Sequence, residues 1–427
     1  MAWDFETDPE FQEKLDWIEA FVTEEVEPVD VLVGHYADVK NPNYIKLVRP
    51  LQKKVKANSL WACHLGPDLG GQGYGQVKLA LMNEIIGRTV IGPSIFGSQA
   101  PDSGNAEILA HYGTAEQKER YLAPLLNNEI SSAFSMTEPQ GGSDPTILQA
   151  TATRDGNFWV INGEKWFSSN ARWAEFLIVM AQTDPEGPPH ERASMFIVPT
   201  KTPGVEFVRH VSIASFDKDG SEGYLRFTDV RVPADHLLGG ENKGFAVAQT
   251  RLGGGRIHHA MRTVGRCRSL LDMMCRRVAS RFTQGESLSR KQMVQEKLAD
   301  SWIELEQFRL LVLRTAWLID KHKDYRKVIG DIAAVKAAMP KLQHDIAVRA
   351  LQLHGSHGVS DEFPFVQDVV ASFILGLADG PTEIHKLSLA RQMLKRYPTT
   401  SDVFPDYHLP QRRERALAIY GDLLDPT

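Results

Sequence analysis

The sequence predicts an α+β protein of several domains: an N-terminal helical domain, a middle antiparallel β domain and a C-terminal helical bundle. Two changes of hydrophobic period predict this order. Apolar residues recur at helical spacing in residues 1–130, form short alternating runs in 131–240, and return to helical spacing in 241–397. Residues 398–427 form a tail. A chain of 427 residues can hold two or three domains with a substantial core.

The first region carries helix-start signals. Asp8 and Pro9 supply a capping side chain and a proline at the first helical position, before the periodic run "FQEKLDWIEAFVTEEV". Thr114 and Gln117 have the spacing of a capping box. A glycine-rich loop, "GPDLGGQGYGQ", lies between these two starts.

The middle region reads as short strands. "TILQATATRDGNFWVINGEKWF" holds two alternating runs joined around Asp155-Gly156, which predicts a hairpin. Four more runs follow, separated by Pro, Gly and Asp: "FLIVMAQT", "SMFIVPT", "VEFVRHV" and "GYLRFTDVRVP". Such a series predicts a compact, mostly antiparallel β domain.

The last region predicts long bundle helices. "QEKLADSWIELEQFRLLVLRTAWLIDKH" has apolar residues at steps of three and four. "VIGDIAAVKAAMPKLQHDIAVRALQLHG" repeats the pattern and ends at Gly355, a helix-stop residue. The tail contains one further amphipathic piece, "QRRERALAIYGDLL".

Composition narrows the class of protein. A net charge of −6 argues against a nucleic-acid surface, and the longest apolar runs, such as "FLIVMA", are too short to span a membrane. Three cysteines without a C-x-x-C pair predict neither a disulfide framework nor a cysteine zinc site. The acidic N-terminus lacks the features of a signal peptide. We therefore expect a cytoplasmic protein with no metal site.

Common nucleotide and catalytic motifs do not match. The glycine-rich loop supplies Gly71 and Gly73, but Gln76 stands where G-x-G-x-x-G needs its third glycine. No G-x-x-x-x-G-K-[ST], H-E-x-x-H or G-x-S-x-G pattern occurs.

Two segments of the β region suit binding of a flat heteroaromatic ring. "SSAFSMTEPQGGSD" (131–144) gathers small residues, hydroxyls and backbone amides, and "NGEKWFSSNA" (162–171) sets Trp166 and Phe167 beside two serines. An aromatic face with a neighbouring hydroxyl offers stacking and polar recognition. Taken alone, either segment is better explained as a hairpin that buries an aromatic residue.

Together and in this order, the two segments resemble the acyl-CoA dehydrogenase family. Its flavin site carries T-E-P-x-x-G-S-D, followed by N-G-x-K-x-W/F-[IS]-[TS]-N. The resemblance extends from about Glu10 to Tyr397 and implies an acyl-CoA dehydrogenase-like fold with FAD as cofactor. In the β region it implies that the FAD contacts include Phe134, Met136, Thr137, Gly142, Ser143, Phe167 and Ser169.

The resemblance implies further FAD contacts in the helical bundle. Arg281 matches an arginine that reaches the FAD pyrophosphate of a neighbouring subunit, where a guanidinium can form two parallel bonds. Gln292 resembles a glutamine on the adenosine side. Gln352 and Gly355 match a Q-x-x-G-G-x-G segment, in which Ser356 stands where glycine is usual. Glu383 completes the expected FAD set.

The stretch "LADGPTE" (377–383) supports two interpretations. Asp-Gly-Pro is good turn chemistry by itself. However, "LADGPTEIHKLSLAR" also aligns with the family segment Y-E-G-T-x-x-I-x-x-x-x-x-A-R, which places Asp379 on the catalytic base. Some family members keep their base at an alternative position, just before Arg256, and here that residue is Gly255. The resemblance implies substrate contacts by Ser143, Arg256, Ala378 and Gly380.

The implied reaction is the α,β-dehydrogenation of an acyl-CoA thioester to a trans-2-enoyl-CoA, as in fatty acid β-oxidation. Asp379 would remove the α-proton, and electrons would pass to an electron-transfer flavoprotein. A dry site is expected to raise the pKa of such a carboxylate toward the working range. The resemblance also implies a homodimer or homotetramer. Two alternatives remain: a flavin oxidase of the same superfamily (nitroalkane oxidase or acyl-CoA oxidase), or a non-catalytic scaffold.

Overall fold

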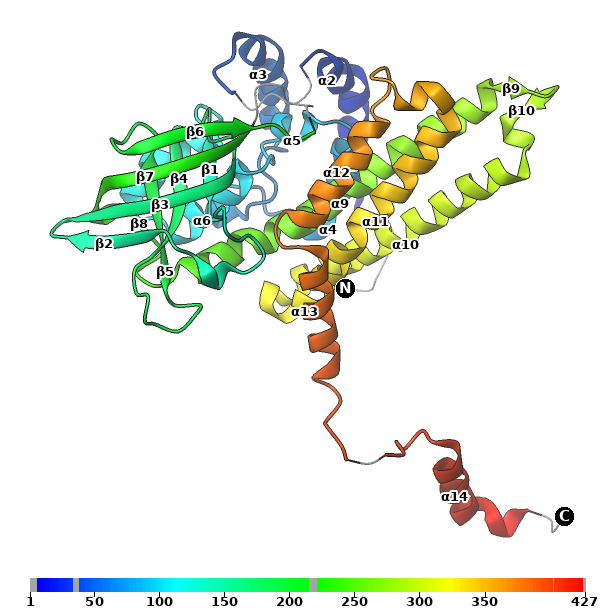
Figure 1. The fold of residues 1–427 in the computed structure, drawn as a ribbon. Helices are drawn as coiled ribbons and strands as arrows, with labels where there is room; N and C mark the ends of the chain where they lie inside the picture. Colours follow the sequence, from blue (N-terminus) through cyan, green and yellow to red (C-terminus); the bar gives the residue numbers. More distant parts are fainter. Residues whose placement is uncertain (1–5, 34–37, 215–220, 402, 425–427) are drawn as a thin grey trace.

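The computed structural model describes residues 6–33, 38–214, 221–401 and 403–424 (Figure 1). Its first part is helical, as predicted. The Asp8 side chain accepts a hydrogen bond from Phe11 N at 3.0 Å, and Thr114 and Gln117 form the predicted capping box. The helices are α1 Pro9–Phe21, α2 Glu27–Val33, α3 Pro42–Ala57, α4 Gln76–Ile86, α5 Gly92–Ile95, α6 Asp102–Tyr112, α7 Ala115–Gln117 and α8 Ala123–Leu126.

A sheet follows, with its described strands in the order β6-β7-β3-β2-β4-β5-β8 and with β1 beside β4. The predicted hairpin is confirmed, because β2 and β3 pair antiparallel around residues 156–157. β1 and β2 each pair parallel with β4, whereas the other pairings are antiparallel. The strands are β1 Ser132–Ser135, β2 Thr151–Asp155, β3 Phe158–Ser169, β4 Phe176–Gln182, β5 Ala193–Pro199, β6 Val205–Val211, β7 Glu222–Pro233 and β8 Leu237–Leu238.

The last part is a bundle of long helices, again as predicted. A short hairpin of β9 Phe282–Thr283 and β10 Glu286–Ser287 joins the first two helices at the end far from the sheet (Figure 1). The tail helix, α14 Leu409–Tyr420, stands apart from the body. The bundle helices are α9 Gly244–Ser280, α10 Gln292–His322, α11 Ile329–His354, α12 Phe365–Leu377 and α13 Thr382–Leu394.

Three apolar clusters hold these parts together. One cluster joins the N-terminal helices to the bundle, so these two helical parts share a core. The second packs one face of the sheet against α6 and the start of α9, and the third covers the opposite face of the sheet. Helices α6 and α9 therefore lie where the sheet meets the bundle.

A buried ion pair fixes the segment that follows β1. Lys165 and Glu138 have side chains that are 0% and 2% exposed, with 2.7 Å between Nζ and Oε1. Lys165 Nζ also donates to Met136 O at 3.0 Å, and Glu138 accepts from the backbone N–H groups of Gln149 and Ala150. These two charged residues of the sequence motifs therefore support the loop between β1 and β2.

Replacing Lys165 with Met should lower the free energy of unfolding by about 3–5 kcal/mol, because it leaves a buried carboxylate without its partner. Chemical denaturation measures this loss. Lys40→Met is the matched control, since Lys40 pairs with Glu175 at the surface, with side chains 60% and 42% exposed. The control should change stability by no more than about 1 kcal/mol. Equal effects of the two substitutions would contradict the proposed structural role of Lys165.

Candidate active site

The two ring-binding segments predicted from the sequence lie side by side. Trp166 N donates to Thr137 O at 2.8 Å, and Ser168 Oγ donates to Ser135 Oγ at 2.8 Å. These bonds join the end of β1 to the end of β3. Gly142 and Ser143 lie in the exposed loop beyond, where a Cβ on Gly142 would stand 3.5 Å from Thr137 Cγ2.

Phe167 has an unusual conformation at this junction. Its φ is +51°, and its side chain is 43% exposed although it lies in a strand. Positive φ is uncommon for a bulky residue and concentrates at functional sites. The pairing of β3 with β7 is irregular between Lys165 and Ser168, which turns the ring outward. Ser169 is engaged differently, since its Oγ donates to Glu222 Oε2 at 2.9 Å.

Asp379 lies in the turn between α12 and α13, as predicted. Its φ is +55°, and that of Gly380 is +101°. Side chains from two other elements hold the carbonyl of Asp379: Arg256 Nε donates to it at 2.9 Å, and His385 Nε2 lies 3.2 Å away. Lys336 Nζ donates to Leu375 O and lies 3.5 Å from Gly380 O. The turn is thus fixed from α9, α11 and α13.

Arg256 therefore supports the turn in this structure, and its predicted contact with substrate stays a prediction. The substrate contacts predicted for Ser143, Ala378 and Gly380 also stay predictions. Glu383 lies exposed in the first turn of α13, close to Asp379 in sequence.

The carboxylate of Asp379 faces one side of α9. Arg251 Nη1 lies 4.0 Å from Oδ1, and His259 Nε2 lies 3.8 Å from Oδ2. Between them is Gly255, where an added Cβ would stand 3.2 Å from Oδ2. Residues 251, 255, 259 and 262 share a helix face because they follow at steps of four, four and three. Residue 255, the alternative position of the base, thus lies directly against the Asp379 carboxylate.

The charges around Asp379 reverse the expected direction of its pKa shift. Burial alone raises the pKa of Asp379, as predicted, but His259, Arg251, Arg256 and Lys336 together hold that pKa below its ordinary value. Burial also lowers the pKa of His259 to about 4, so near pH 7 the permanent cations carry this effect. Asp379 is therefore ionised at neutral pH but is a weaker base than an isolated buried carboxylate.

Arg251 connects the two halves of the site. Its guanidinium lies 4.0 Å from the centroid of the Phe134 ring, and its Nε donates to Asn105 Oδ1 at 3.0 Å. Sequence reasoning missed Arg251, His259, Arg262 and Lys336. The spacing of basic residues in "RLGGGRIHHAMR" could have indicated a basic face on α9.

The remaining predicted cofactor residues lie elsewhere. Arg281 caps the C-terminus of α9 and Gln292 begins α10, at the end of the bundle far from the sheet (Figure 1). The C-terminal end of α11 lies there too, because Arg277 Nη2 donates to His354 O at 3.4 Å. The residues of this distal group, all exposed, are Arg281, Gln292, Gln352, Gly355 and Ser356.

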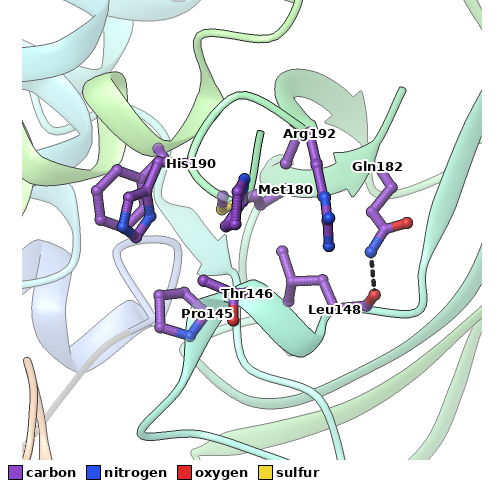
Figure 2. A pocket seen from close by; sticks show the side chains of 10 residues that line it. Pro145, Thr146, Leu148, Met180, Gln182, His190 and Arg192 are labelled. Atoms are coloured by element: carbon purple, nitrogen blue, oxygen red, sulfur yellow. Dashed lines mark hydrogen bonds between the residues drawn. The ribbon is translucent and has the colours of Figure 1, made fainter. Parts of the chain in front are cut away.

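A separate small pocket, with a volume of about 10 Å³, lies between the sheet and the start of α9 (Figure 2). His190 and Phe245 line it, and their rings stack with centroids 4.3 Å apart. Its lining includes none of the predicted site residues. Within the described ranges, no group of three His, Cys, Asp or Glu side chains could hold a metal ion.

Comparison with known proteins identifies the family. Three family models match consecutive parts of the chain: the N-terminal domain of acyl-CoA dehydrogenase over residues 8–129, the middle domain over 133–230 and the C-terminal domain over 242–394. The chain belongs to the acyl-CoA dehydrogenase family.

Curated acyl-CoA dehydrogenase relatives cover most of the chain. FadE2 of Mycobacterium tuberculosis is 39% identical over 360 residues, which are 83% of this chain and 87% of FadE2. Mouse acyl-CoA dehydrogenase family member 10 is 38% identical over 88% of this chain and 36% of its own length. Mouse family member 11 is 38% identical over 90% of this chain and 50% of its own length. The chain thus spans a half or less of these two mouse relatives.

Solved structures share the acyl-CoA dehydrogenase fold. A Mycobacterium abscessus protein assigned to this family is 36% identical, with a TM-score of 0.86 over 92% of this chain and 100% of its own. Butyryl-CoA dehydrogenase from Megasphaera elsdenii is 25% identical, with a TM-score of 0.78 over 92% of this chain and 100% of its own. These neighbours confirm the predicted fold class.

Acyl-CoA dehydrogenases are FAD-dependent oxidoreductases, and the residues present fit that cofactor. The outward-turned Phe167 offers an exposed aromatic face beside Thr137, which suits a flat ring with polar edges. The exposed Arg281 offers a guanidinium for phosphate. The individual FAD contacts stay predictions.

Gly255→Ala should lower the rate at which acyl-CoA reduces the bound flavin about tenfold, because the new methyl group displaces the Asp379 carboxylate by a few tenths of an ångström. The thermal midpoint should not fall, since alanine favours a helix by about 1 kcal/mol over glycine. Gly330→Ala is the control, because its Cβ would meet neighbours only at 3.6 Å or more. A Gly255→Ala enzyme that reduces its flavin as fast as the control would show that the carboxylate position is not critical.

Proposed function

We propose that this protein dehydrogenates an acyl-CoA thioester to the trans-2-enoyl-CoA and that Asp379 removes the α-proton. The observation that carries the proposal is the position of Asp379: an ionised, largely buried carboxylate joined through Arg251 to Phe134 of the predicted flavin segment. A carboxylate in this state can accept a proton from a carbon acid held between it and the flavin site.

Each residue around the turn then has a defined task. Arg256, Lys336 and His385 fix the backbone at residues 375–380, and the positive φ of Asp379 aims its side chain toward α9. Holding the base in one geometry supplies much of the rate enhancement in reactions of this kind. FAD, when bound, supplies the acceptor for the β-hydrogen, and this chain supplies the base and the orientation.

We further propose that a second subunit completes the cofactor site. Arg281 follows Arg251 by 30 positions (281 − 251) along α9 and its C-cap, which corresponds to about 45 Å. A single cofactor is too short to contact both ends. The exposed distal group therefore fits a cofactor bound mainly by a partner, in a homodimer or homotetramer.

Electron-transfer flavoprotein is the proposed electron acceptor. A solved chain titled "Electron transferring flavoprotein of Acidaminococcus fermentans" is 26% identical, with a TM-score of 0.76, and this supports a link between the fold and that partner. We also propose a cytoplasmic location, supported by three free thiols, Cys63, Cys267 and Cys275. In the described part of the chain, no helix is long and apolar enough to cross a membrane.

Asp379→Asn should abolish bleaching of the flavin by acyl-CoA under anaerobic conditions. Removal of a general base typically costs about 10²–10⁴-fold, and asparagine keeps nearly the same shape. Stopped-flow absorbance measures the rate, and the visible flavin spectrum confirms that FAD is retained. Asp379→Glu, whose carboxylate is displaced by one methylene, should be slowed about 10²-fold. Near wild-type bleaching by Asp379→Asn would leave Asp379 with a turn role only.

Arg281→Ala should weaken FAD retention without lowering the thermal midpoint of the apoprotein, because Arg281 is exposed and distant from the base. Equilibrium dialysis measures the dissociation constant of FAD, which should rise at least about tenfold if a charge-assisted phosphate contact is lost. Arg276→Ala, a nearby exposed arginine paired with Asp272, should leave the FAD affinity unchanged. Equal FAD affinities in the two variants would remove Arg281 from the cofactor site.

A further inference from the structure

Arg262, His259 and Asp379 form a chain of contacts that ends at the proposed base. Arg262 Nη2 lies 3.2 Å from His259 Nδ1, and His259 Nε2 lies 3.8 Å from Asp379 Oδ2. Arg262 and His259 lie about one turn apart on the same face of α9, whereas Asp379 belongs to the turn between α12 and α13. The two nitrogens of the His259 ring therefore face different partners, a guanidinium and a carboxylate.

The contact with Arg262 determines which nitrogen of His259 carries the proton. A guanidinium offers only N–H donors and accepts no hydrogen bond, so Nδ1 must present a lone pair to it. Burial lowers the pKa of Arg262 to about 10, although the charge of Asp379 opposes this shift, so Arg262 is a cation at neutral pH. Its Nη1 also donates to Ser98 O at 3.3 Å, which anchors the guanidinium. A neutral imidazole whose Nδ1 accepts a hydrogen bond carries its proton on Nε2.

The same contact keeps His259 uncharged. A second proton would bind at Nδ1 and point at the N–H groups of Arg262, which would break the contact. Burial and the charge of Arg262 lower the pKa of His259 to about 4, in agreement with this geometry. At neutral pH, His259 therefore presents an uncharged N–H donor to Asp379.

The two oxygens of the Asp379 carboxylate have different surroundings. Oδ2 lies against α9, because an added Cβ on Gly255 would stand 3.2 Å from it and His259 Nε2 lies 3.8 Å from it. Oδ1 lies 4.0 Å from Arg251 Nη1, and the guanidinium of Arg251 contacts the ring of Phe134 in the predicted flavin segment. Oδ2 thus faces the helix, and Oδ1 faces the side of the flavin segment.

We propose that His259 is a positioning residue whose Nε2–H donates to Oδ2 of Asp379 and leaves Oδ1 to take the α-proton, while Arg262 holds the required tautomer. This inference rests on the proposed function, because it assigns roles to the two oxygens of the proposed base. A separation of 3.8 Å is long for a hydrogen bond, but such bonds in free enzymes are often long and shorten in the substrate complex.

The donor fits both protonation states of the base. As the α C–H bond breaks, its proton forms a new O–H bond at Oδ1, and the electron pair stays with the substrate. Oδ2 then becomes the carbonyl oxygen of a neutral carboxyl group and still accepts from Nε2–H. No proton moves between His259 and Asp379. A donor that is in place before and after the transfer requires no rearrangement during the reaction.

The donor has two opposite effects on the rate, and their sizes decide the expected result. A hydrogen bond to the ionised carboxylate lowers its pKa and weakens it as a base. Loss of the bond would raise that pKa by about one unit, which strengthens the base by no more than about tenfold. Misplacement of the carboxylate by about 1 Å can cost about 10²-fold. Loss of His259 should therefore slow the reaction about tenfold.

Stopped-flow reduction of the FAD-loaded enzyme separates positioning from binding, with the straight-chain acyl-CoA that bleaches the wild-type flavin fastest. His259→Phe keeps a flat ring without a donor. It should lower the limiting rate of flavin reduction about tenfold and change the dissociation constant of the thioester by less than about twofold. His259→Gln, whose amide N–H can replace Nε2–H, should recover most of the rate.

His344→Phe is the matched control for these variants. His344 lies on α11 with a side chain that is 39% exposed, and its Nδ1 lies 3.1 Å from Asp345 Oδ1. This substitution also replaces a histidine of the bundle with phenylalanine, but away from the base, and should keep the wild-type limiting rate.

Ring ¹⁵N spectra of histidine-labelled protein test the tautomer without substrate or turnover. The His259 signals, assigned as those that His259→Gln removes, should show a protonated Nε2 and an unprotonated Nδ1 at neutral pH. Arg262→Met removes the donor to Nδ1, so the other tautomer should also become populated. Arg262→Lys retains a donor and should preserve the wild-type spectrum.

A wild-type limiting rate in His259→Phe, or a His259→Gln enzyme no faster than His259→Phe, would overturn the positioning role and leave the proposed function intact. A proton on Nδ1 in the wild-type spectrum would overturn the role of Arg262. Near wild-type bleaching by Asp379→Asn would instead defeat the proposed function and this inference with it.

Discussion

The burial of one carboxylate among several cations is the constraint on which the site depends. The Asp379 carboxylate lies close against Gly255 of α9. Arg256, Lys336 and His385 bind backbone carbonyls of the turn, in which Asp379 has a positive φ. Helix α9 also supplies Arg251, which contacts Phe134 of the sheet. Moving any one of these elements would leave a buried charge without partners, which is strongly unfavourable.

The fold class could be predicted from the sequence because the patterns that indicate it are local. Hydrophobic period separates helix from strand, and the Asp8 cap, the capping box at Thr114 and the turn around Gly156 each act over a few residues. The turn at Asp379 could be predicted for the same reason. The parallel pairing of β1 with β4 could not be predicted, since paired residues such as Ser132 and Phe176 lie 44 positions apart (176 − 132) and carry no local signal of their pairing.

The electrostatics of the site could not be predicted from the sequence, because they depend on tertiary structure. Burial of Asp379 suggested a raised pKa, yet cations of α9 and α11, among them Arg251 and Arg256 more than a hundred positions earlier in the chain, reverse the shift. Arg251 and His259 become informative only once α9 is known to face the turn. Glu138 and Lys165, conversely, belong to the flavin motifs, but their buried pair explains them as supports of the loop. A motif can therefore mix binding residues with residues that only position them.

As the proposed base, Asp379 should exchange a proton with the α-carbon of a bound acyl thioester. Incubation of the enzyme in D₂O with a thioester that cannot lose its β-hydrogen isolates this step, and mass spectrometry counts the deuterium that enters the α-position. Deuterium should enter the α-position with the wild-type protein and should not rise above background with Asp379→Asn. Equal incorporation by both proteins would show that Asp379 is not the group that removes the α-proton.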